Sequence, residues 1–284
     1  MTSTWQSLVD HVERDRSLLE PNRLRQRIEA LDRLEDYLID PSHQHDDARL
    51  RERARAIYTD LEAINRGIYE DIRRDIQHGA GAAKLLTWLP DVALNDGGAS
   101  GEGYDYLDVL LSGVLQFEEP SDGIAALAPD MVFYQPTPAR HIFDLLDRLS
   151  LGEQDVLIDL GSGLGHVSLL TAICTNARCV GIELEPAYIA CAQQCAKALN
   201  LHNVSFVQQD VRAADLSRGS VFYLYTPFTG ALLREVLDML RREATKRDLR
   251  ICTLGPCTSV VAGEAWLSLV GALDVNRVTV FRNA

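Results

Sequence analysis

From residue 155 onward, short apolar runs alternate with stretches of helical pattern. Six of these runs read as strands: VLIDL, CVGIEL, VSFVQQD, VFYLYTPF, LRICTLG and VNRVTVFRNA. Strands that alternate with helices are typical of a parallel sheet covered by helices on both faces. Ligands of such sheets bind at the carboxyl ends of the strands. The alternation therefore predicts an α/β domain over residues 131–284, with its ligand site at one edge of the sheet.

The first 130 residues show a different pattern, which predicts an all-helical domain. Apolar residues at helical spacing predict one amphipathic helix over residues 24–38 and a longer one over residues 50–76. Residues 90–103 are rich in glycine and predict a loop, and residues 104–117 predict a further buried helix. We expect residues 1–130 to form a helical cap that recognises the substrate.

The net charge of −13 is concentrated in this helical half. Residues 1–130 carry 14 Lys and Arg against 26 Asp and Glu, whereas residues 131–284 carry 14 against 15. Residues 85–130 hold nine acids and no Lys or Arg. Such a surface repels phosphate backbones and attracts cations, although acidic surfaces also simply aid solubility. The charge argues against nucleic-acid binding and favours a cationic substrate or a basic partner.

The six cysteines all lie in the second half of the chain and form no disulfide framework. Cys191 and Cys195 are one helical turn apart, but no CxxC or HxxxH motif completes a tetrahedral metal site. We expect reduced, buried thiols and no metal. The N-terminus lacks the apolar core of a signal peptide, and no apolar run approaches the ~20 residues that span a bilayer. A cytoplasmic protein without membrane association is expected.

The glycine turn after the first predicted strand reads DLGSGLG, residues 159–165. A dinucleotide-binding GxGxxG motif would place its third glycine one residue later, and a P-loop would end in GK[ST]. The acid at residue 159 would repel a pyrophosphate, but it suits an ammonium or a sulfonium-bearing amino acid. The glycines let the backbone approach a ligand closely. The turn therefore predicts a cationic ligand without phosphate.

This DLGSGLG segment resembles motif I of the class I S-adenosylmethionine (SAM) methyltransferases. The resemblance implies a class I methyltransferase fold, with a seven-stranded, mostly parallel, doubly wound sheet. It also implies SAM as the cofactor and S-adenosylhomocysteine as the product. Residues of the turn that the resemblance assigns to the cofactor are Asp159, Gly161, Ser162, Gly163 and Gly165. Taken alone, Asp159 could simply cap the helix that follows.

Three further strand ends match the same family in order. Glu183 ends the second strand about 20 residues after the glycine turn, where an acid can accept both ribose hydroxyls. Asp210 and Val211 follow the third strand, where the family places an acid near the adenine amino group and a backbone amide near the ring. Tyr225 ends the fourth strand and is expected to contact both cofactor and acceptor. Asp210 could also be a plain loop residue.

A Y-x-PTP segment, residues 134–138, precedes the first strand. It resembles a segment in a subset of methyltransferases that includes non-SET protein-lysine enzymes, in which the tyrosine and threonine lie close to SAM. We therefore expect Tyr134 and Thr137 to contact the cofactor. Thr137 is also expected to be the N-cap of the next helix, with Pro138 as its first residue. His166 and His141 lie near helix starts, and a solvated or capping role is favoured over catalysis for both.

Methyl transfer from a sulfonium requires alignment and desolvation of the acceptor more than it requires a triad or a metal. The fourth strand ends in YTPF, without the Asn or Asp of the (N/D)PP(Y/F) motif that binds planar amines. It also lacks the asparagines of non-SET histone lysine enzymes. Aromatic faces with nearby carboxylates favour a cationic amine, and Tyr225 could accept or relay its proton. Residues expected to face the acceptor are Tyr225, Thr226, Phe228 and Tyr134.

These patterns leave several functions open. The first is SAM-dependent methylation of an amine, for which a protein lysine is one candidate, with Asp105 and Asp108 of the cap attracting the substrate. The second is a small-molecule O- or N-methyltransferase with the helical domain as a lid. A third is a catalytically silent SAM-binding or scaffold protein, against which the intact glycine turn and its acids argue. A NAD-linked oxidoreductase is disfavoured by the glycine spacing.

Overall fold

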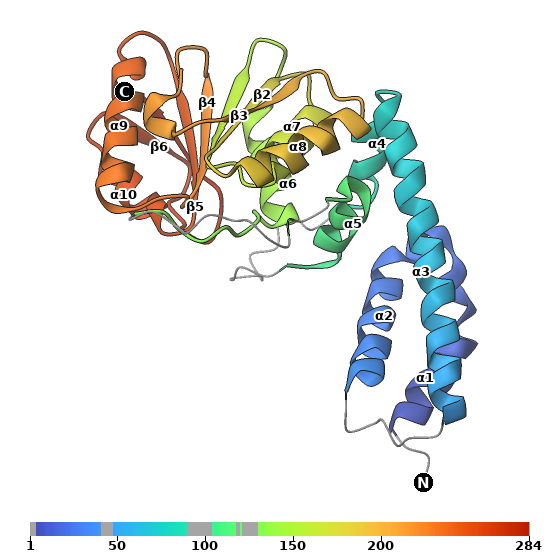
Figure 1. Ribbon diagram of the computed structural model, residues 1–284. Helices are drawn as coiled ribbons and strands as arrows, with labels where there is room; N and C mark the ends of the chain where they lie inside the picture. Colours follow the sequence, from blue (N-terminus) through green and yellow to red (C-terminus); the bar gives the residue numbers. More distant parts are fainter. Residues whose placement is uncertain (1–3, 41–47, 90–103, 118–119, 121–129, 284) are drawn as a thin grey trace. The chain divides into compact units, whose positions relative to one another are not determined.

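The computed structural model of the chain describes residues 4–40, 48–89, 104–117, 120 and 130–283. The chain divides into two compact units. The first comprises Met1–Arg73 with Asp105–Val114, and the second comprises Arg74–Tyr104 with Leu115–Ala284. Figure 1 shows the helical first unit and the sheet of the second. The predicted loop over residues 90–103 lies outside the described residues.

The first unit is built from helices. Its elements are α1 (Thr4–Arg14), two short 3-10 helices (Arg16–Leu19 and Pro21–Arg23), α2 (Leu24–Ile39), most of α3 (Ala48–Gln77) and α5 (Tyr106–Leu115). The bounds of α2, α3 and α5 confirm the three helices that the apolar spacing predicts. Apolar side chains of α1, α2 and α3, such as Val9, Leu34 and Leu61, pack into one core.

Asp105 and Asp108, which we expected to attract a cationic substrate, cap the N-terminus of α5. The backbone N–H of Leu107 donates to Asp105 Oδ1 (2.8 Å), and the N–H of Asp105 donates to Asp108 Oδ2 (2.7 Å). These side chains satisfy backbone donors that a helix start leaves unpaired. The other acids of residues 85–130 lie outside the described residues, except Asp130.

The second unit carries a seven-stranded sheet in the order β3-β2-β1-β4-β5-β7-β6. Strands β1 to β5 are parallel, and β7 runs antiparallel to both β5 and β6. The strands are β1 (Val156–Leu160), β2 (Arg178–Glu183), β3 (Val204–Gln208), β4 (Val221–Tyr225), β5 (Arg250–Leu254), β6 (Leu267–Val270) and β7 (Thr279–Asn283). This topology confirms the expected mostly parallel, doubly wound sheet.

Helices cover both faces of the sheet. On one face lie α6 (Ala139–Leu149), α7 (His166–Cys174) and α8 (Pro186–Ala198), and on the other lie α9 (Gly230–Ala244) and α10 (Cys257–Ala262); α4 (Gly81–Leu86) contacts α7 (Figure 1). Ile158 and Phe222 on the strands belong to one hydrophobic core with Leu237 of α9. Successive strand residues face opposite sides, so β1 and β4 read as continuous apolar runs because both sides are buried.

Strand β6 is the element that the sequence pattern did not locate. It has only four residues, and three of them are exposed. It pairs with β7 alone, at the edge of the sheet. A short, exposed edge strand needs neither alternation nor a continuous apolar run, so the pattern that reveals the other strands is missing.

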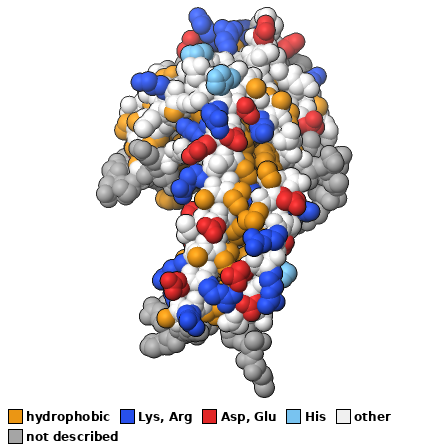
Figure 2. Space-filling model, turned by 90° about the vertical axis from the view of Figure 1, so that its right-hand side faces the viewer, with side chains coloured by type: hydrophobic (Ala, Val, Ile, Leu, Met, Phe, Trp, Pro, Cys, Tyr) orange, Lys and Arg blue, Asp and Glu red, His pale blue; other side chains and the backbone are white. Residues whose placement is uncertain are grey.

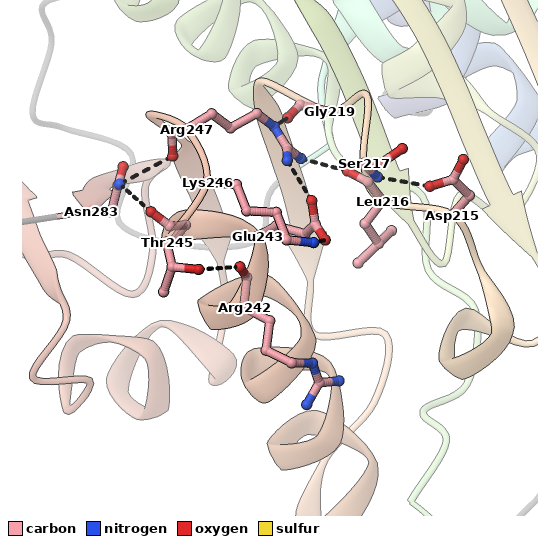
Figure 3. Close-up of polar contacts among 11 residues, drawn as sticks. Asp215, Leu216, Ser217, Gly219, Arg242, Glu243, Thr245, Lys246, Arg247 and Asn283 are labelled. Atoms are coloured by element: carbon pink, nitrogen blue, oxygen red, sulfur yellow. Dashed lines mark hydrogen bonds and ion pairs between the residues drawn. The ribbon is translucent and has the colours of Figure 1, made fainter.

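At the amino ends of the parallel strands, polar side chains bind backbone carbonyls (Figure 3). Arg247 donates to the carbonyls of Gly219 (3.0 Å) and Leu216 (2.7 Å) and forms an ion pair with Glu243. The Asn283 amide donates to the Ala244 and Arg247 carbonyls, at 3.0 and 3.3 Å. These bonds join the end of α9 and the end of β7 to the loop before β4.

The surface in Figure 2 carries acidic and basic side chains side by side, with hydrophobic ones between them. A nucleic-acid-binding face is more often a basic patch or stripe. Within the part of the chain that the structure describes, no helix combines the length and the apolar character needed to cross a bilayer.

Candidate active site

A cavity of about 570 Å³ lies at the carboxyl edge of the sheet, within the second unit. Its walls come from the ends of β1, β2 and β4, from the loop after β3, and from residues 130–137. This is the edge at which open α/β sheets bind their ligands. All predicted site residues line the cavity except Gly163 and Gly165, which lie in the turn beneath it.

The glycines of the turn are required by the backbone and by its neighbours. Gly161, Gly163 and Gly165 have φ angles of 81°, 52° and 84°, a region that L side chains rarely adopt. A Cβ on Gly161 would lie 2.4 Å from the Pro227 side chain, and one on Gly163 would lie 1.9 Å from the Tyr134 ring. The turn is therefore closely packed on two sides, and only glycine fits.

Asp159 is the residue before the last of β1 and has only 3% of its surface exposed. Burial, together with the negative charge of Glu183, raises the pKa of Asp159 to about 7. The hydroxyl of Ser168 is its hydrogen-bond donor, at 3.5 Å. A buried carboxylate with so little compensation is stabilised by a cation, so this position suits a positively charged ligand group.

Glu183 is fixed by backbone donors on both of its oxygens. Oε2 accepts from Gly163 N (2.9 Å), and Oε1 accepts from Leu184 N (2.7 Å) and Glu185 N (2.9 Å). Each carboxylate oxygen has two lone pairs, so Oε1 is fully used by its two backbone donors and Oε2 can still accept from a ligand hydroxyl. The glycine turn and the end of β2 are thereby joined into one rigid support.

Two other predicted cofactor residues also lie on the cavity. Asp210 accepts from Arg212, whose guanidinium and backbone N–H lower the pKa of this carboxyl. Val211 follows it, in a 3-10 helix (Val211–Ala213) that Asp210 caps. Asp210 therefore stabilises its own loop, as the alternative interpretation expected, and it also lines the cavity.

Thr137 does not cap the next helix. Helix α6 begins at Ala139 with Pro138 as its N-cap, and no side chain caps it. The Thr137 hydroxyl instead lies 3.1 Å from the hydroxyl of Tyr223, and both groups are buried. The expectation of capping was wrong because this buried phenol offers the threonine hydroxyl a partner away from the helix start.

Sequence reasoning missed Tyr223, which lines the cavity beside Asp159 on the neighbouring strand. A signal was available, because Tyr223 lies two residues before Tyr225 and alternate residues of a strand share a face. Burial raises the pKa of Tyr223 well above its ordinary value. The phenol is therefore a neutral wall of the cavity.

The residues expected to face the acceptor differ in their surroundings. Tyr225 and Phe228 line the cavity. Thr226 also lines it, but its hydroxyl donates to Leu254 O (3.2 Å) and accepts from Cys257 N (3.1 Å). Thr226 has a φ angle of 39°, which is strained for a β-branched residue. Its hydroxyl joins the ends of β4 and β5 to α10, which indicates a positioning role.

Residues 130–134 form a strap along the end of β4 that the sequence pattern did not predict. Met131 pairs with Phe228 in an antiparallel bridge, and Val132 N donates to Pro227 O (3.2 Å). Asp130 Oδ2 accepts from Ala231 N (3.1 Å) and so caps α9. The strap holds Phe133 at the cavity with 79% of its surface exposed.

His166 lies on the cavity wall, whereas His141 does not. Its Nδ1 atom is 3.2 Å from the Tyr134 hydroxyl, and its ring centroid is 4.7 Å from that of Phe117. Burial lowers the pKa of His166 to about 4, so the imidazole is neutral at pH 7. The ring is half-buried at the cavity wall, and no side chain caps α7, so the helix-capping role was wrong.

Carboxylates dominate the charge of the cavity wall. Of the lining residues that the structure describes, Arg212 alone is a Lys or Arg, and it is paired with Asp210. The lining acids are Asp130, Asp159, Glu183, Glu185, Asp210 and Glu235. Among the described residues, no group of three His, Cys, Asp or Glu side chains is arranged to hold a metal.

Residues 151–237 match the family model of a methyltransferase domain. The chain carries a SAM-dependent methyltransferase domain. The segment that matches the family model includes β1 to β4 and the first half of α9. It therefore includes the glycine turn and the strand ends described above. The seven-stranded sheet agrees with the class I methyltransferase fold.

A histone-lysine N-methyltransferase from Caenorhabditis elegans, specific for H3 lysine-79, is 41% identical over 66 residues. That alignment spans 22% of this chain and 7% of the worm protein. Among solved structures, an RNA methyltransferase from Salinibacter ruber is 27% identical, with a TM-score of 0.42 over 52% of this chain and 92% of that one. A SAM-dependent methyltransferase from Aquifex aeolicus is 15% identical, with a TM-score of 0.42 over 50% and 89%.

The cavity of this methyltransferase domain fits SAM. The buried Ser162 hydroxyl lines it and has no hydrogen-bond partner in the described chain, which leaves it available to a ligand. Asp159 suits a cationic group, and Glu183 Oε2 can accept a hydrogen bond from a ligand hydroxyl. When bound, SAM supplies an electrophilic methyl group on a positively charged sulfur.

Proposed function

We propose that this protein methylates a primary or secondary amine and that a protein lysine is the acceptor. The observation that carries the proposal is the charge of the cavity wall. Among the described residues that line the cavity, six are acids and one is an arginine, Arg212, which is paired with Asp210. Such a wall favours cationic groups and disfavours phosphate-bearing acceptors.

The cofactor does not account for all of these acids. We assign Asp159, Glu183 and Asp210 to cofactor binding, while Asp130 and Glu185 cap helices. Glu235 remains, an exposed acid on α9 that lines the cavity. Its carboxylate can attract the ammonium group of an acceptor.

Phe133 supports an acceptor with an aliphatic stem. The strap holds its exposed ring at the cavity wall. A lysine side chain has both parts that this arrangement recognises, an apolar stem and a cationic head. The lysine-specific name of the C. elegans relative agrees with this acceptor, over the short segment that the two proteins share.

An ammonium acceptor must lose a proton before its nitrogen can attack a methyl group. Tyr225 at the end of β4 lines the cavity and is the side chain that we assign to accept or relay that proton. Desolvation by Phe228 and Tyr134 lowers the pKa of an ammonium in the cavity and so eases its deprotonation.

The test is a screen in which the full chain and labelled SAM are incubated with extract proteins, metabolites and RNA. Label in proteins, lost when their lysines are chemically acetylated, supports the proposal. Label only in metabolites indicates the small-molecule alternative, and label in RNA would contradict the proposed acceptor class.

Variants at the cavity then test the acceptor side directly. Glu235→Gln and Phe133→Ser should each raise KM for the acceptor about three- to tenfold and leave the Kd for S-adenosylhomocysteine unchanged. Asp238→Asn is the matched control, because Asp238 is on the same helix and does not line the cavity. An unchanged KM in both test variants would remove Glu235 and Phe133 from the acceptor site.

A further inference from the structure

Tyr134 and His166 meet at the cavity from segments 32 residues apart. The Tyr134 hydroxyl lies 3.2 Å from His166 Nδ1, within reach of a hydrogen bond. The ring of Tyr134 lies against the glycine turn, since a Cβ on Gly163 would come within 1.9 Å of it. The ring also lies beside that of Tyr188 of α8, at 4.9 Å between centroids.

The imidazole is itself held by its surroundings. His166 is the first residue of α7, directly after Gly165, so its backbone is fixed by the turn. The Phe117 ring packs on it at a centroid distance of 4.7 Å. With the imidazole neutral and its proton on Nε2, Nδ1 can accept from a phenol.

We propose that His166 is a positioning residue, whose Nδ1 accepts a hydrogen bond from the Tyr134 hydroxyl and holds that ring over Gly163 as a wall of the cofactor site. The inference rests on the proposed cofactor site. The Tyr134 hydroxyl then donates to the imidazole and does not receive the proton that the acceptor loses. Tyr134 shapes the site without taking part in proton transfer.

A neutral imidazole is the form that suits this position. A protonated one would lose the acceptor lone pair and place a second positive charge beside a cationic cofactor. Partial burial beside the Phe117 ring disfavours the charged form and lowers the pKa of His166 to about 4.

The experiment is calorimetric titration of the full chain with S-adenosylhomocysteine, using Tyr134→Phe, His166→Phe and the double variant. Tyr134→Phe keeps the ring against Gly163, and His166→Phe keeps a ring beside Phe117, so each single change removes one end of the hydrogen bond. We expect each single change to raise Kd about three- to tenfold. The Kd of the double variant should be no higher than that of the weaker-binding single variant.

His166→Asn separates positioning from a general structural role. Its amide places a hydrogen-bonding atom near the position of Nδ1 but has no ring for Phe117, so we expect Kd within about twofold of wild type. His202→Phe, at an exposed histidine, is the control for the substitution itself. Thermal unfolding of every variant checks that each one is folded.

The outcomes separate the inference from the proposed function. Additive losses in the double variant, or a loss in His166→Asn as large as in His166→Phe, would overturn the positioning role while the cofactor site stands. Unchanged Kd in both single variants would overturn it as well. Folded wild-type protein that binds no S-adenosylhomocysteine would overturn the proposed site and this inference together.

Discussion

The amino edge of the central sheet, where the parallel strands begin, and the carboxyl edge, where they end, are built in opposite ways. At the amino edge, Arg247 and Asn283 bind backbone carbonyls, and Asp155 accepts from Gly152 N (3.0 Å) and Ser220 Oγ (3.0 Å) and pairs with Arg250. At the carboxyl edge, Asp159 is buried with a raised pKa and the Ser162 hydroxyl has no partner in the described chain. One edge is satisfied internally, whereas the other is completed by a ligand.

Backbone strain occurs at both edges and is denser at the carboxyl edge. Positive φ angles occur there at Gly161, Gly163, Gly165, Thr226, Gly230 and Gly255, and at the amino edge at Ser150 and Asn200, in the loops before β1 and β3. Strained or unsatisfied groups persist where the surrounding structure holds them, and they gather at functional sites. Substitutions at the amino edge should therefore change stability, and those at the carboxyl edge should change ligand binding.

The largest expected effect is that of Asp159→Asn on cofactor binding. Removing the buried charge leaves a cationic ligand group without its partner, at a cost of about 3 kcal/mol or more. Calorimetry with S-adenosylhomocysteine should show Kd raised about 100-fold or more. Asp155→Asn, at the amino edge of the same strand, is the control and should leave Kd unchanged.

Without ligand, Asp159→Asn should stabilise the protein at alkaline pH. The carboxyl has a pKa of about 7 in the folded protein against its ordinary value of 3.8, so the unfolded chain loses this proton first as pH rises. In the wild type, the contribution of this carboxyl to the free energy of unfolding is fully present below about pH 4 and is lost as the pH rises to about 7. Urea unfolding at pH 5 and pH 8 should show the larger gain for the variant at pH 8; a gain independent of pH would contradict the raised pKa.

Gly163→Ala comes next. An alanine there has an unfavourable φ and collides with the Tyr134 ring, so we expect Kd to rise about tenfold and stability to fall by about 1–2 kcal/mol. Gly271→Ala is the matched control, with a φ of 87° and nothing within 4 Å of the added Cβ. It should lose stability alone. Equal Kd values for the two variants would mean that the Tyr134 contact does not matter for binding.

Arg247→Met tests the amino edge. The change removes the side-chain donors to the carbonyls of Leu216 and Gly219 and the ion pair with Glu243, and we expect a loss of about 1–2 kcal/mol in urea unfolding. Kd for S-adenosylhomocysteine should stay within error. Arg242→Met, one turn earlier on α9 and pointing away from this network, should be near neutral (Figure 3).

Thr226→Val should have the smallest effect, about 1 kcal/mol, because the valine keeps the shape and loses the bonds to Leu254 O and Cys257 N. Thr226→Ser keeps both bonds and should retain stability. If valine reduced turnover strongly without any change in unfolding, the positioning role of the hydroxyl would be wrong.

The sequence predicts the sheet well because β1, β2 and β4 are buried apolar runs that end in acids or aromatics. The glycine turn is predicted equally well, since only glycine suits its φ angles and its close neighbours. The strap of residues 130–134 was not predicted, because one isolated bridge and a helix cap leave no periodic pattern. The Thr137–Tyr223 and Tyr134–His166 contacts join distant segments, and no local signal reveals them.

The strap has a consequence for the order in which the protein is made. Asp130 and Met131 leave the ribosome about a hundred residues before Phe228 and Ala231, the partners that hold them. Pairing over such a sequence separation is slow to form. A nascent chain that ends before α9 therefore exposes the glycine turn without its outer wall, so the capacity to bind ligand should appear only late in synthesis.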